Sequence, residues 1–393
     1  MNVLMLLSDG FGALGGMSKF NRDFLQALDA SATINRVHAV PRVIPDSINE
    51  SLPESVVYDR RAARGKIAFV RRAAAHAWYD SRIELVVCGH VHLLPVAYFI
   101  ARHRNACLSL IIHGVEAWKP TGSRLTNRLA RSIDRLIAVS ELSTEKFCEW
   151  SRLPAAKAFV LPNCVDLDRF IPQPRDTALV RRYGLASSRV IMTLGRLESR
   201  ERYKGFDEVL EAMPALVARF PDLKYLIVGD GEDSERLHNK ADQLGIHDRV
   251  VFAGRIPENE KVRHYNLADA YVMPSMGEGF GIVLIEAAAC GIPVIGSNAD
   301  GSREALLQGR LGRLIDPRDA QQLKDAIAET LAAGAPRVRN EAIETFGTKE
   351  FRARVDGWLH GQLGHCRPGR RSTKSPELDI GHGRLANLAG GPH

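Results

Sequence analysis

The feature that most constrains the fold of this chain is an alternation of short apolar runs with longer helical patterns. Several of the runs, such as residues 108–113, are almost wholly apolar, as expected for strands buried on both faces of a sheet. Strands that alternate with helices predict parallel sheets covered by helices, and therefore an α/β fold. In the first half the expected strands are residues 3–7, 36–40, 85–88, 108–113, 136–139 and 159–161, with helices at 19–28 and 93–102.

The alternation stops at the turn-rich run 163–174 and then begins again. The second series has expected strands at residues 190–194, 225–228, 250–253, 270–273, 293–296 and 313–315, with helices at 206–219, 234–244, 258–265 and 282–290. Two successive series predict two doubly wound, Rossmann-like domains that face each other across a cleft, where ligands of such sheets bind. We expect an N-terminal domain at 1–168, a C-terminal domain at 169–345, a helix at 346–365 that packs back on the N-terminal domain, and a disordered tail at 366–393.

Length and composition agree with this organisation. A chain of 393 residues is too long for one ordinary core, and its 45% hydrophobic and 25% charged content is typical of globular proteins. No apolar run is long enough to span a membrane, and the apolar first residues lack the basic leader of a signal peptide, so we expect a cytoplasmic protein. The cysteines show no CxxC pair, and His90 and His92 lack a third ligand, so no metal site is expected.

The net charge of +7 is unevenly spread. One basic segment contains Arg60, Arg61, Arg64, Lys66, Arg71 and Arg72, and a second group, Arg124, Arg128, Arg131 and Arg135, has spacings that would place all four on one face of a helix. These residues form either solvated helix faces or a surface for anionic lipid headgroups, two interpretations of about equal weight. Nucleic acid is not expected as a partner, because no aromatic platform or known module accompanies the charge.

The segment 275–287 is the strongest candidate for a functional site. A strand ends, a glycine-rich turn follows, and an apolar helix begins, which together can cradle a diphosphate on unpaired N–H groups at the positive end of the helix dipole. Glu286, about one turn into the helix, could accept hydrogen bonds from two ribose hydroxyls, and Glu278 on the turn would lie nearer a transferred sugar. Taken alone, the segment is better explained as a plain strand–turn–helix with two incidental carboxylates.

Further candidates follow other strands of the second series. Arg196 and Lys204 come after the strand at 190–194, where they could stabilise charge on a departing diphosphate or simply be solvated. Gly229 lies in a tight Gly-Asp-Gly turn, and Gly254 and Ile256 follow the next strand, where they could offer backbone groups to a base. An ordinary strand-to-helix loop would account equally well for the turn at Gly229.

From Gly195 to about Leu306 the sequence resembles the donor-binding domain of the GT-B glycosyltransferases of family 4. The Glu-x7-Glu signature is matched by Glu278 and Glu286, and the Arg and Lys that precede it by Arg196 and Lys204. The resemblance implies that Glu286 holds the ribose, that Arg196 and Lys204 hold the diphosphate, and that Glu278 contacts the sugar. It also implies that the N–H groups of Phe280, Gly281, Ile282 and Val283 meet the phosphates or the sugar hydroxyls.

The N-terminal half offers two further candidates. Gly15 and Gly16 lie in a loop similar to the family's glycine-rich loop near donor and acceptor, although a plain tight turn is about as good an explanation. His113 ends a strand where family members often have a His that touches the donor sugar, and a structural His is the alternative. With Glu278, Arg196 and Lys204, His113 completes the set of candidate catalytic residues.

The resemblance implies a retaining glycosyltransferase that needs no metal or other cofactor, because Arg196 and Lys204 supply the positive charge, and that uses front-face displacement. We favour GDP-mannose as donor, with UDP-glucose or another UDP-hexose next, because residues 201–207 resemble bacterial exopolysaccharide mannosyl- and glucosyltransferases. The expected acceptor is a polyprenyl-linked saccharide or another glycan in cell-surface polysaccharide biosynthesis, with peripheral contact at the inner face of the plasma membrane. The main alternative is a nucleotide-sugar epimerase of the same architecture, and a dehydrogenase is disfavoured because the first turn does not match G-x-G-x-x-G.

Overall fold

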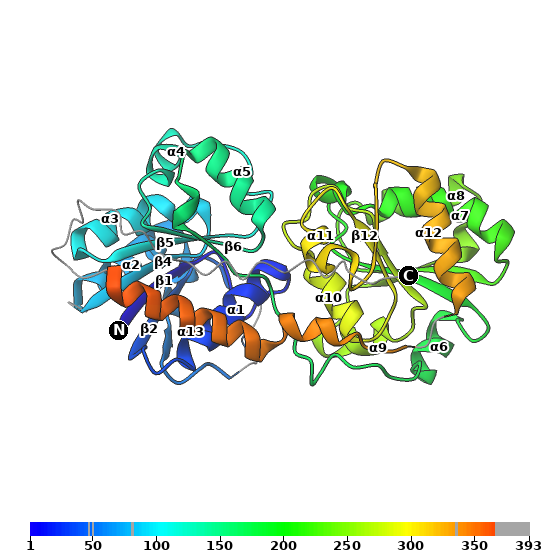
Figure 1. Cartoon of the computed structure of the whole chain (residues 1–393), viewed down its shortest axis with the longest axis horizontal. Helices are drawn as coiled ribbons and strands as arrows, with labels where there is room; N and C mark the ends of the chain where they lie inside the picture. The colour runs from blue at the N-terminus through cyan, green and yellow to red at the C-terminus, as the bar shows by residue number, and fades with distance from the viewer. Residues whose placement is uncertain (46–47, 49–50, 80–81, 335–336, 366–393) are drawn as a thin grey trace, which may run out of the picture.

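Two parallel sheets, one in each half of the chain, organise the structure (Figure 1). The computed structural model describes residues 1–45, 48, 51–79, 82–334 and 337–365, so the tail predicted at 366–393 lies outside the described residues. The first sheet has seven strands in the order β3-β2-β1-β4-β5-β6-β7, and the second has six in the order β10-β9-β8-β11-β12-β13. Every strand pairing in both sheets is parallel, so the two predicted Rossmann-like sheets are confirmed.

The strands of the first sheet run close to the predicted limits. They are β1 (Asn2–Leu7), β2 (Arg36–Pro41), β3 (Val56–Tyr58), β4 (Ile83–Cys88), β5 (Cys107–Ile112), β6 (Arg135–Ala138) and β7 (Ala158–Val160). The sequence did not predict β3, since this strand has only three residues at the edge of the sheet and too little apolar alternation to stand out. The helices of the N-terminal domain are α1 (Gly16–Asp29), α2 (Lys66–Tyr79), α3 (Leu94–Arg104), α4 (Arg124–Ala130) and α5 (Glu141–Ser151).

The second domain repeats the pattern. Its strands are β8 (Arg189–Leu194), β9 (Leu223–Val228), β10 (Val250–Gly254), β11 (Ala270–Met273), β12 (Val294–Ser297) and β13 (Arg313–Ile315). Its helices are α6 (Thr177–Tyr183), α7 (Phe206–Arg219), α8 (Ser234–Gln243), α9 (Lys261–Tyr265), α10 (Ile282–Ala289), α11 (Ser302–Ala305) and α12 (Ala320–Ala333).

The predicted alignment of four arginines on one helix is wrong. Helix α4 ends at Ala130, and Arg135 is the first residue of the buried strand β6. Arg124, Arg128 and Arg131 are exposed, whereas Arg135 is half-buried. The i, i+4 spacing could not show this, because the chain between Arg131 and Arg135 already turns into the next strand.

Helix α13 (Thr348–His365) returns to the N-terminal domain and lies along α1 (Figure 1). Phe351 stacks edge-on against Phe20 with ring centroids 5.7 Å apart, and Trp358 lies 6.0 Å from the ring of Phe24. These aromatic contacts bury apolar surface that α1 alone would leave open to water. The chain therefore crosses between the domains twice, once near residue 165 and once near residue 345.

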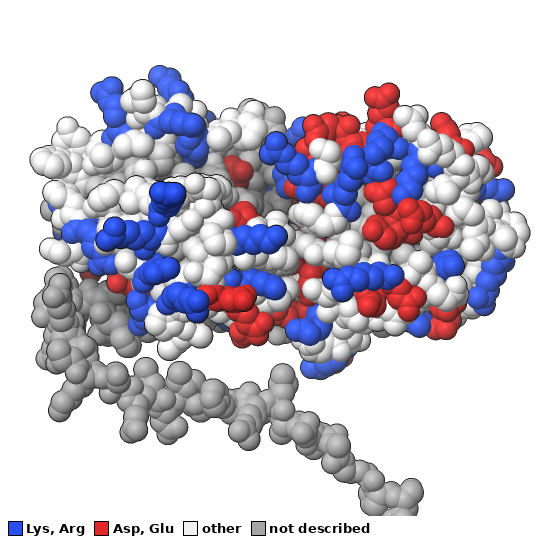
Figure 2. All heavy atoms as spheres, turned by 90° about the horizontal axis from the view of Figure 1, so that it is seen from above, with Lys and Arg blue, Asp and Glu red and all other residues white. Residues whose placement is uncertain are grey.

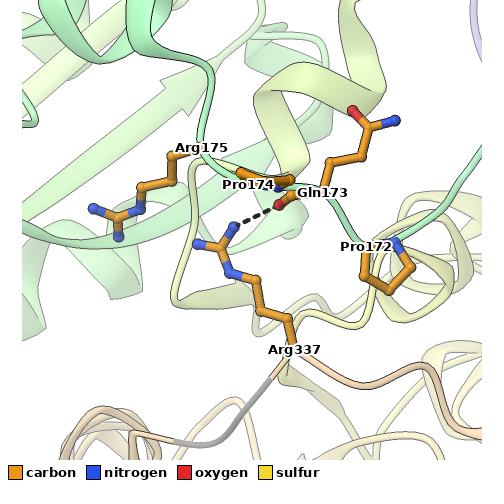
Figure 3. Close-up of a pocket in the computed structure, with 5 residues that line it drawn as sticks. All are labelled: Pro172, Gln173, Pro174, Arg175 and Arg337. Carbon is orange, nitrogen blue, oxygen red and sulfur yellow. Dashed lines mark hydrogen bonds between the residues drawn. The ribbon is translucent and has the colours of Figure 1, made fainter.

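The two crossovers are bonded to each other. The backbone N–H of Val165 donates to the carbonyl of Phe346 at 2.9 Å. Arg337 reaches from the second crossover to the carbonyl of Gln173 in the first at 3.3 Å, as Figure 3 shows, and to that of Ala268 at 3.0 Å. The surface pocket of about 480 Å³ around Arg337 belongs to this junction and contains none of the predicted site residues.

None of the helices in the described part of the chain combines the length and the apolar character that a membrane crossing requires.

Candidate active site

The loops that follow the central strands of both sheets meet between the two domains. In the second sheet β8 and β11 are neighbours, and the chain winds outward from them in opposite directions. Such a switch point separates the loops after the two strands and opens a crevice at their carboxyl ends. In the first sheet β1 and β4 have the same relation. Seen from above, the surface is hollowed where the two domains meet (Figure 2).

Lys204 and Glu278 come together at the second switch point. The Nζ of Lys204 lies 3.5 Å from Glu278 Oε1 and 3.1 Å from Glu201 Oε2. Burial lowers the pKa of Lys204, but the charges of Glu278 and Glu201 outweigh it and hold the pKa above its usual range. Lys204 therefore stays protonated at neutral pH.

Arg196 belongs to the same cluster through Glu201, which accepts from its guanidinium. The side chain of Arg196 is 66% exposed, so it has room to change its orientation. Glu201 was not among the predicted site residues, although it lies between the two predicted cations in the sequence. Its carboxylate pairs with both of them.

Glycines allow the loops after β8 and β11 to touch. A Cβ on Gly277 would lie 2.8 Å from the ring of Tyr203, and one on Gly205 would lie 2.6 Å from Pro274. The N–H of Met276 donates to the carbonyl of Tyr203 at 2.8 Å. The predicted glycine-rich turn is thus packed on the neighbouring loop.

Helix α10 begins at this turn with no side-chain cap. Gly281 precedes it with a φ of 91°, a conformation that favours glycine, so the first N–H groups of the helix are left for other partners. Phe280 is buried with its ring 5.3 Å from that of Phe346, and Ile282 and Val283 are half-buried. From the other domain, a Cβ on Gly16 would lie 3.6 Å from Ile282.

Glu286 is fully buried in α10 and already has protein partners. Tyr265 donates its hydroxyl to Oε2 at 2.8 Å, and the Nζ of Lys261 lies 3.4 Å from Oε1. A carboxylate has about four acceptor positions, so these two donors leave capacity for hydroxyl groups. Lys261 is 16% exposed and Glu286 is 0% exposed, so the side chains would have to shift before a ligand could touch Glu286.

A buried carboxylate, Asp300, holds the backbone of Glu278. Its Oδ2 accepts from the N–H of Glu278 at 2.8 Å and from the hydroxyl of Ser275 at 2.7 Å. Burial raises the pKa of Asp300 to about 6, against the hydrogen bonds, which lower it. Asp300 was not predicted, since only the pairing of β11 with β12 brings its loop beside Glu278.

His113 lies at the cleft, but its side chain already makes one hydrogen bond and one ring contact within the protein. Nε2 lies 3.1 Å from the carbonyl of Gly89, and the ring stacks edge-on against Phe20 with centroids 5.2 Å apart. Burial lowers the pKa of His113 to about 4, so the imidazole is neutral. Because a carbonyl only accepts, Nε2 carries the hydrogen, and Nδ1 is the acceptor that a sugar hydroxyl could use.

The remaining predicted glycines differ in what surrounds them. A Cβ on Gly229 would lie 1.8 Å from the carbonyl of Gly195, so this glycine permits contact between neighbouring loops and need not face a ligand. Gly15, with a φ of 108°, and Gly254, with a φ of 70°, have open space beside them. Ile256 is half-buried against the core.

Comparisons with known proteins agree with this geometry. Residues 14–169 match the family model "Glycosyltransferase Family 4", and residues 181–345 match "Glycosyl transferases group 1". A GDP-mannose-dependent alpha-(1-6)-phosphatidylinositol monomannoside mannosyltransferase of Mycolicibacterium smegmatis is 32% identical over 74% of this chain and 75% of that protein. A phosphatidyl-myo-inositol mannosyltransferase of Mycobacterium tuberculosis is 37% identical over 85% of this chain and 87% of that protein.

Among solved structures, Anabaena Alr3699/HepE in complex with UDP-glucose superposes with a TM-score of 0.73 at 21% identity, covering 92% of this chain and 100% of that one. That likeness shows the two-domain GT-B fold. The chain belongs to glycosyltransferase family 4 and is a hexosyltransferase of GT-B architecture.

Proposed function

We propose that this chain is a retaining mannosyltransferase that transfers mannose from GDP-mannose to a lipid-linked acceptor, with a UDP-hexose as the second-choice donor. The observation that carries the proposal is the cluster at the β8–β11 switch point. There Lys204 pairs with Glu278, which comes shortly before the uncapped start of α10, and Arg196 joins them through Glu201. The GDP-mannose donor and the lipid acceptor are supported by the names of the two mannosyltransferase relatives.

In this proposal the diphosphate lies against Arg196, Lys204 and the N–H groups of Phe280, Gly281, Ile282 and Val283. Breaking the bond between the sugar and the diphosphate leaves negative charge on the leaving oxygen, and preorganised cations lower the energy of that state. Arg196 exchanges its contact with Glu201 for the ligand. No metal ion or other cofactor is needed for this step, because the two cations provide the charge.

The other predicted residues hold the ends of the donor. Glu286 accepts from the ribose hydroxyls once Lys261 moves aside, and Gly254 and Ile256 offer backbone groups to the base. Glu278 and the Nδ1 of His113 accept hydrogen bonds from sugar hydroxyls, while Gly15 and Gly16 allow the N-terminal domain to approach. The leaving phosphate takes the proton of the acceptor hydroxyl, so the acceptor attacks from the same face and the anomeric configuration is retained.

A basic surface on the N-terminal domain supports a membrane-bound acceptor. Helices α2, α3 and α4 are neighbours, and residues 60–79, 94–104 and 124–131 contain no Asp or Glu. Between their cations, Ile67, Trp78 and Phe99 are 76%, 71% and 60% exposed. On the N-terminal half of the face in Figure 2, Lys and Arg side chains outnumber Asp and Glu. Each cation near an anionic bilayer contributes about 1 kcal/mol, and aromatic rings insert at the headgroup level, so we place the chain peripherally at the inner membrane face.

The activity test is incubation with GDP-mannose, UDP-glucose and UDP-GlcNAc, with and without phosphatidylinositol mannoside or polyprenyl-diphosphate saccharide. We expect GDP release that requires the lipid and a mannosylated lipid product. Release of free nucleotide without acceptor, together with an isomerised sugar, would instead identify an epimerase and refute the proposal.

The membrane contact is tested by sedimentation with vesicles of phosphatidylcholine alone or with added phosphatidylinositol. The double variant W78A/F99A should bind the anionic vesicles at least tenfold more weakly, whereas V338A, which removes a 70% exposed side chain of the second crossover, should bind as the wild type does. Equal binding of W78A/F99A and the wild type would exclude this face as the membrane contact.

A further inference from the structure

Glu304 in the C-terminal domain makes a direct contact with the N-terminal domain. Its Oε2 accepts from the backbone N–H of Glu141 at 2.7 Å, and its Oε1 accepts from that of Leu142 at 3.0 Å. These are the first two residues of α5, whose N–H groups have no partner within the helix. A carboxylate there is stabilised by two charge-assisted hydrogen bonds and by the positive end of the helix dipole.

The segment that carries Glu304 also holds the loop of Glu278. Asp300 accepts from the N–H of Glu278, and the N–H of Gly301 donates to the carbonyl of Glu278 at 2.9 Å. Asp300 Oδ1 also accepts from the N–H of Ser302, the first residue of the short helix α11 on which Glu304 lies. Both backbone polar groups of Glu278 are therefore fixed by residues that adjoin α11.

The opposite side of the same loop touches the N-terminal domain. A Cβ on Gly279 would lie 2.0 Å from the carbonyl of His113, and one on Gly301 would lie 2.2 Å from the carbonyl of Gly279. The backbone of residues 278–279 is thus packed between the end of β5 and the 300–304 segment. A rotation that separates the domains would break the Glu304 contact and release one side of the Glu278 loop.

We propose that Glu304 is a positioning residue that couples closure of the two domains to the placement of Glu278. Both of its carboxylate oxygens are engaged by the backbone of α5, and it acts through α5 on one side and through the 300–301 backbone on the other. The proposal rests on the proposed function only in that the Glu278 loop holds a nucleotide-sugar. When the domains separate, Glu304 loses both N–H partners and is hydrated, so the contact favours the closed form.

The test compares E304A, E304Q and the matched control R303A, which removes the exposed neighbouring side chain on the same short helix. Small-angle scattering of the free proteins reports closure, calorimetry with GDP and GDP-mannose reports donor affinity, and steady-state kinetics report kcat and KM. We expect E304A to have a larger radius of gyration and a kcat/KM about ten- to a hundredfold lower, since two charge-assisted hydrogen bonds are lost. E304Q keeps the length of the side chain and one acceptor oxygen, but it loses the charge and turns an NH2 donor toward one of the two N–H groups. It should therefore fall between E304A and the wild type, and R303A should match the wild type.

A merely structural role for Glu304 would lower the melting temperature and leave the scattering and donor affinity of the folded protein unchanged. That result, or wild-type scattering and kinetics in E304A, would overturn the proposal. If E304A fails to fold, E304Q gives the same comparison. If the wild type binds no nucleotide-sugar, the proposed function fails, while scattering of the free variants still decides whether Glu304 holds the domains together.

Discussion

Replacing Lys204 by Met tests the centre of the proposed site. Met keeps the length of the side chain and removes its charge, so Glu278 and Glu201 lose the cation that lies 3.5 Å and 3.1 Å from them. With an effective dielectric constant of about 20, each of these contacts is worth about 5 kcal/mol before desolvation is counted. Desolvation offsets much of this attraction, and breaking a buried ion pair typically costs about 3–5 kcal/mol. Because Lys204 is 15% exposed, we expect K204M to lower the free energy of unfolding by about 3 kcal/mol, the lower end of this range.

The effect of K204M on catalysis is separate from that loss of stability. Removing one preorganised group that faces developing charge lowers kcat by about 100- to 1000-fold, or about 2.7–4 kcal/mol. Urea unfolding would measure the stability, and mannose transfer at saturating GDP-mannose would measure kcat. R200M, which changes an exposed cation in the same 3-10 helix, is the control.

Two results would refute the reasoning about Lys204. The first is a kcat of K204M within about threefold of the wild type while the donor is bound, because the leaving group would then gain its stabilisation elsewhere. The second comes from combining K204M with E201Q. Since E201Q removes one of the uncompensated carboxylates, K204M should cost less stability in that background, and strict additivity would contradict the ion-pair account.

Three further changes test other parts of the site. E286A should lose donor binding, measured by calorimetry, and normal affinity would contradict the ribose assignment. Burial raises the pKa of Asp300 to about 6. Between about pH 4 and pH 6 this carboxyl therefore binds more protons in the folded protein than in the unfolded chain. Its contribution to the free energy of unfolding falls as pH rises through that window, by on the order of 3 kcal/mol. The free energy of unfolding in urea, taken as the wild type minus D300N, should fall by this amount between about pH 4 and pH 6, and a difference that does not change with pH would assign the effect to another group. G279A should weaken donor binding at least tenfold because its Cβ would meet the carbonyl of His113, whereas G122A, with no atom within 4 Å of its Cβ, should bind normally.

The expected elements of the fold followed from local patterns. Buried strands such as β5 are nearly all apolar, and the run at residues 163–174 interrupts the alternation, so two parallel sheets could be predicted without knowing their strand order. Local pattern failed for β3, which is short, and for the end of α4, where a helix-like spacing of arginines continues into a strand. A spacing of three or four residues places side chains on one helix face only as long as the chain stays helical. The end of α4 is set by tertiary packing.

The candidate residues of the Glu-x7-Glu segment and of the cationic loop could be named from the sequence, because motif chemistry is local to the chain. How these residues are held depends on contacts that form only in the folded structure. Glu201 lies against both cations, Lys261 and Tyr265 contact Glu286, and Asp300 fixes the backbone of Glu278. Glu304 reaches a helix 163 residues earlier in the chain. Such contacts join the ends of strands that are neighbours in space but distant in sequence, and neighbour order in a parallel sheet is set by crossover topology, which no local pattern records.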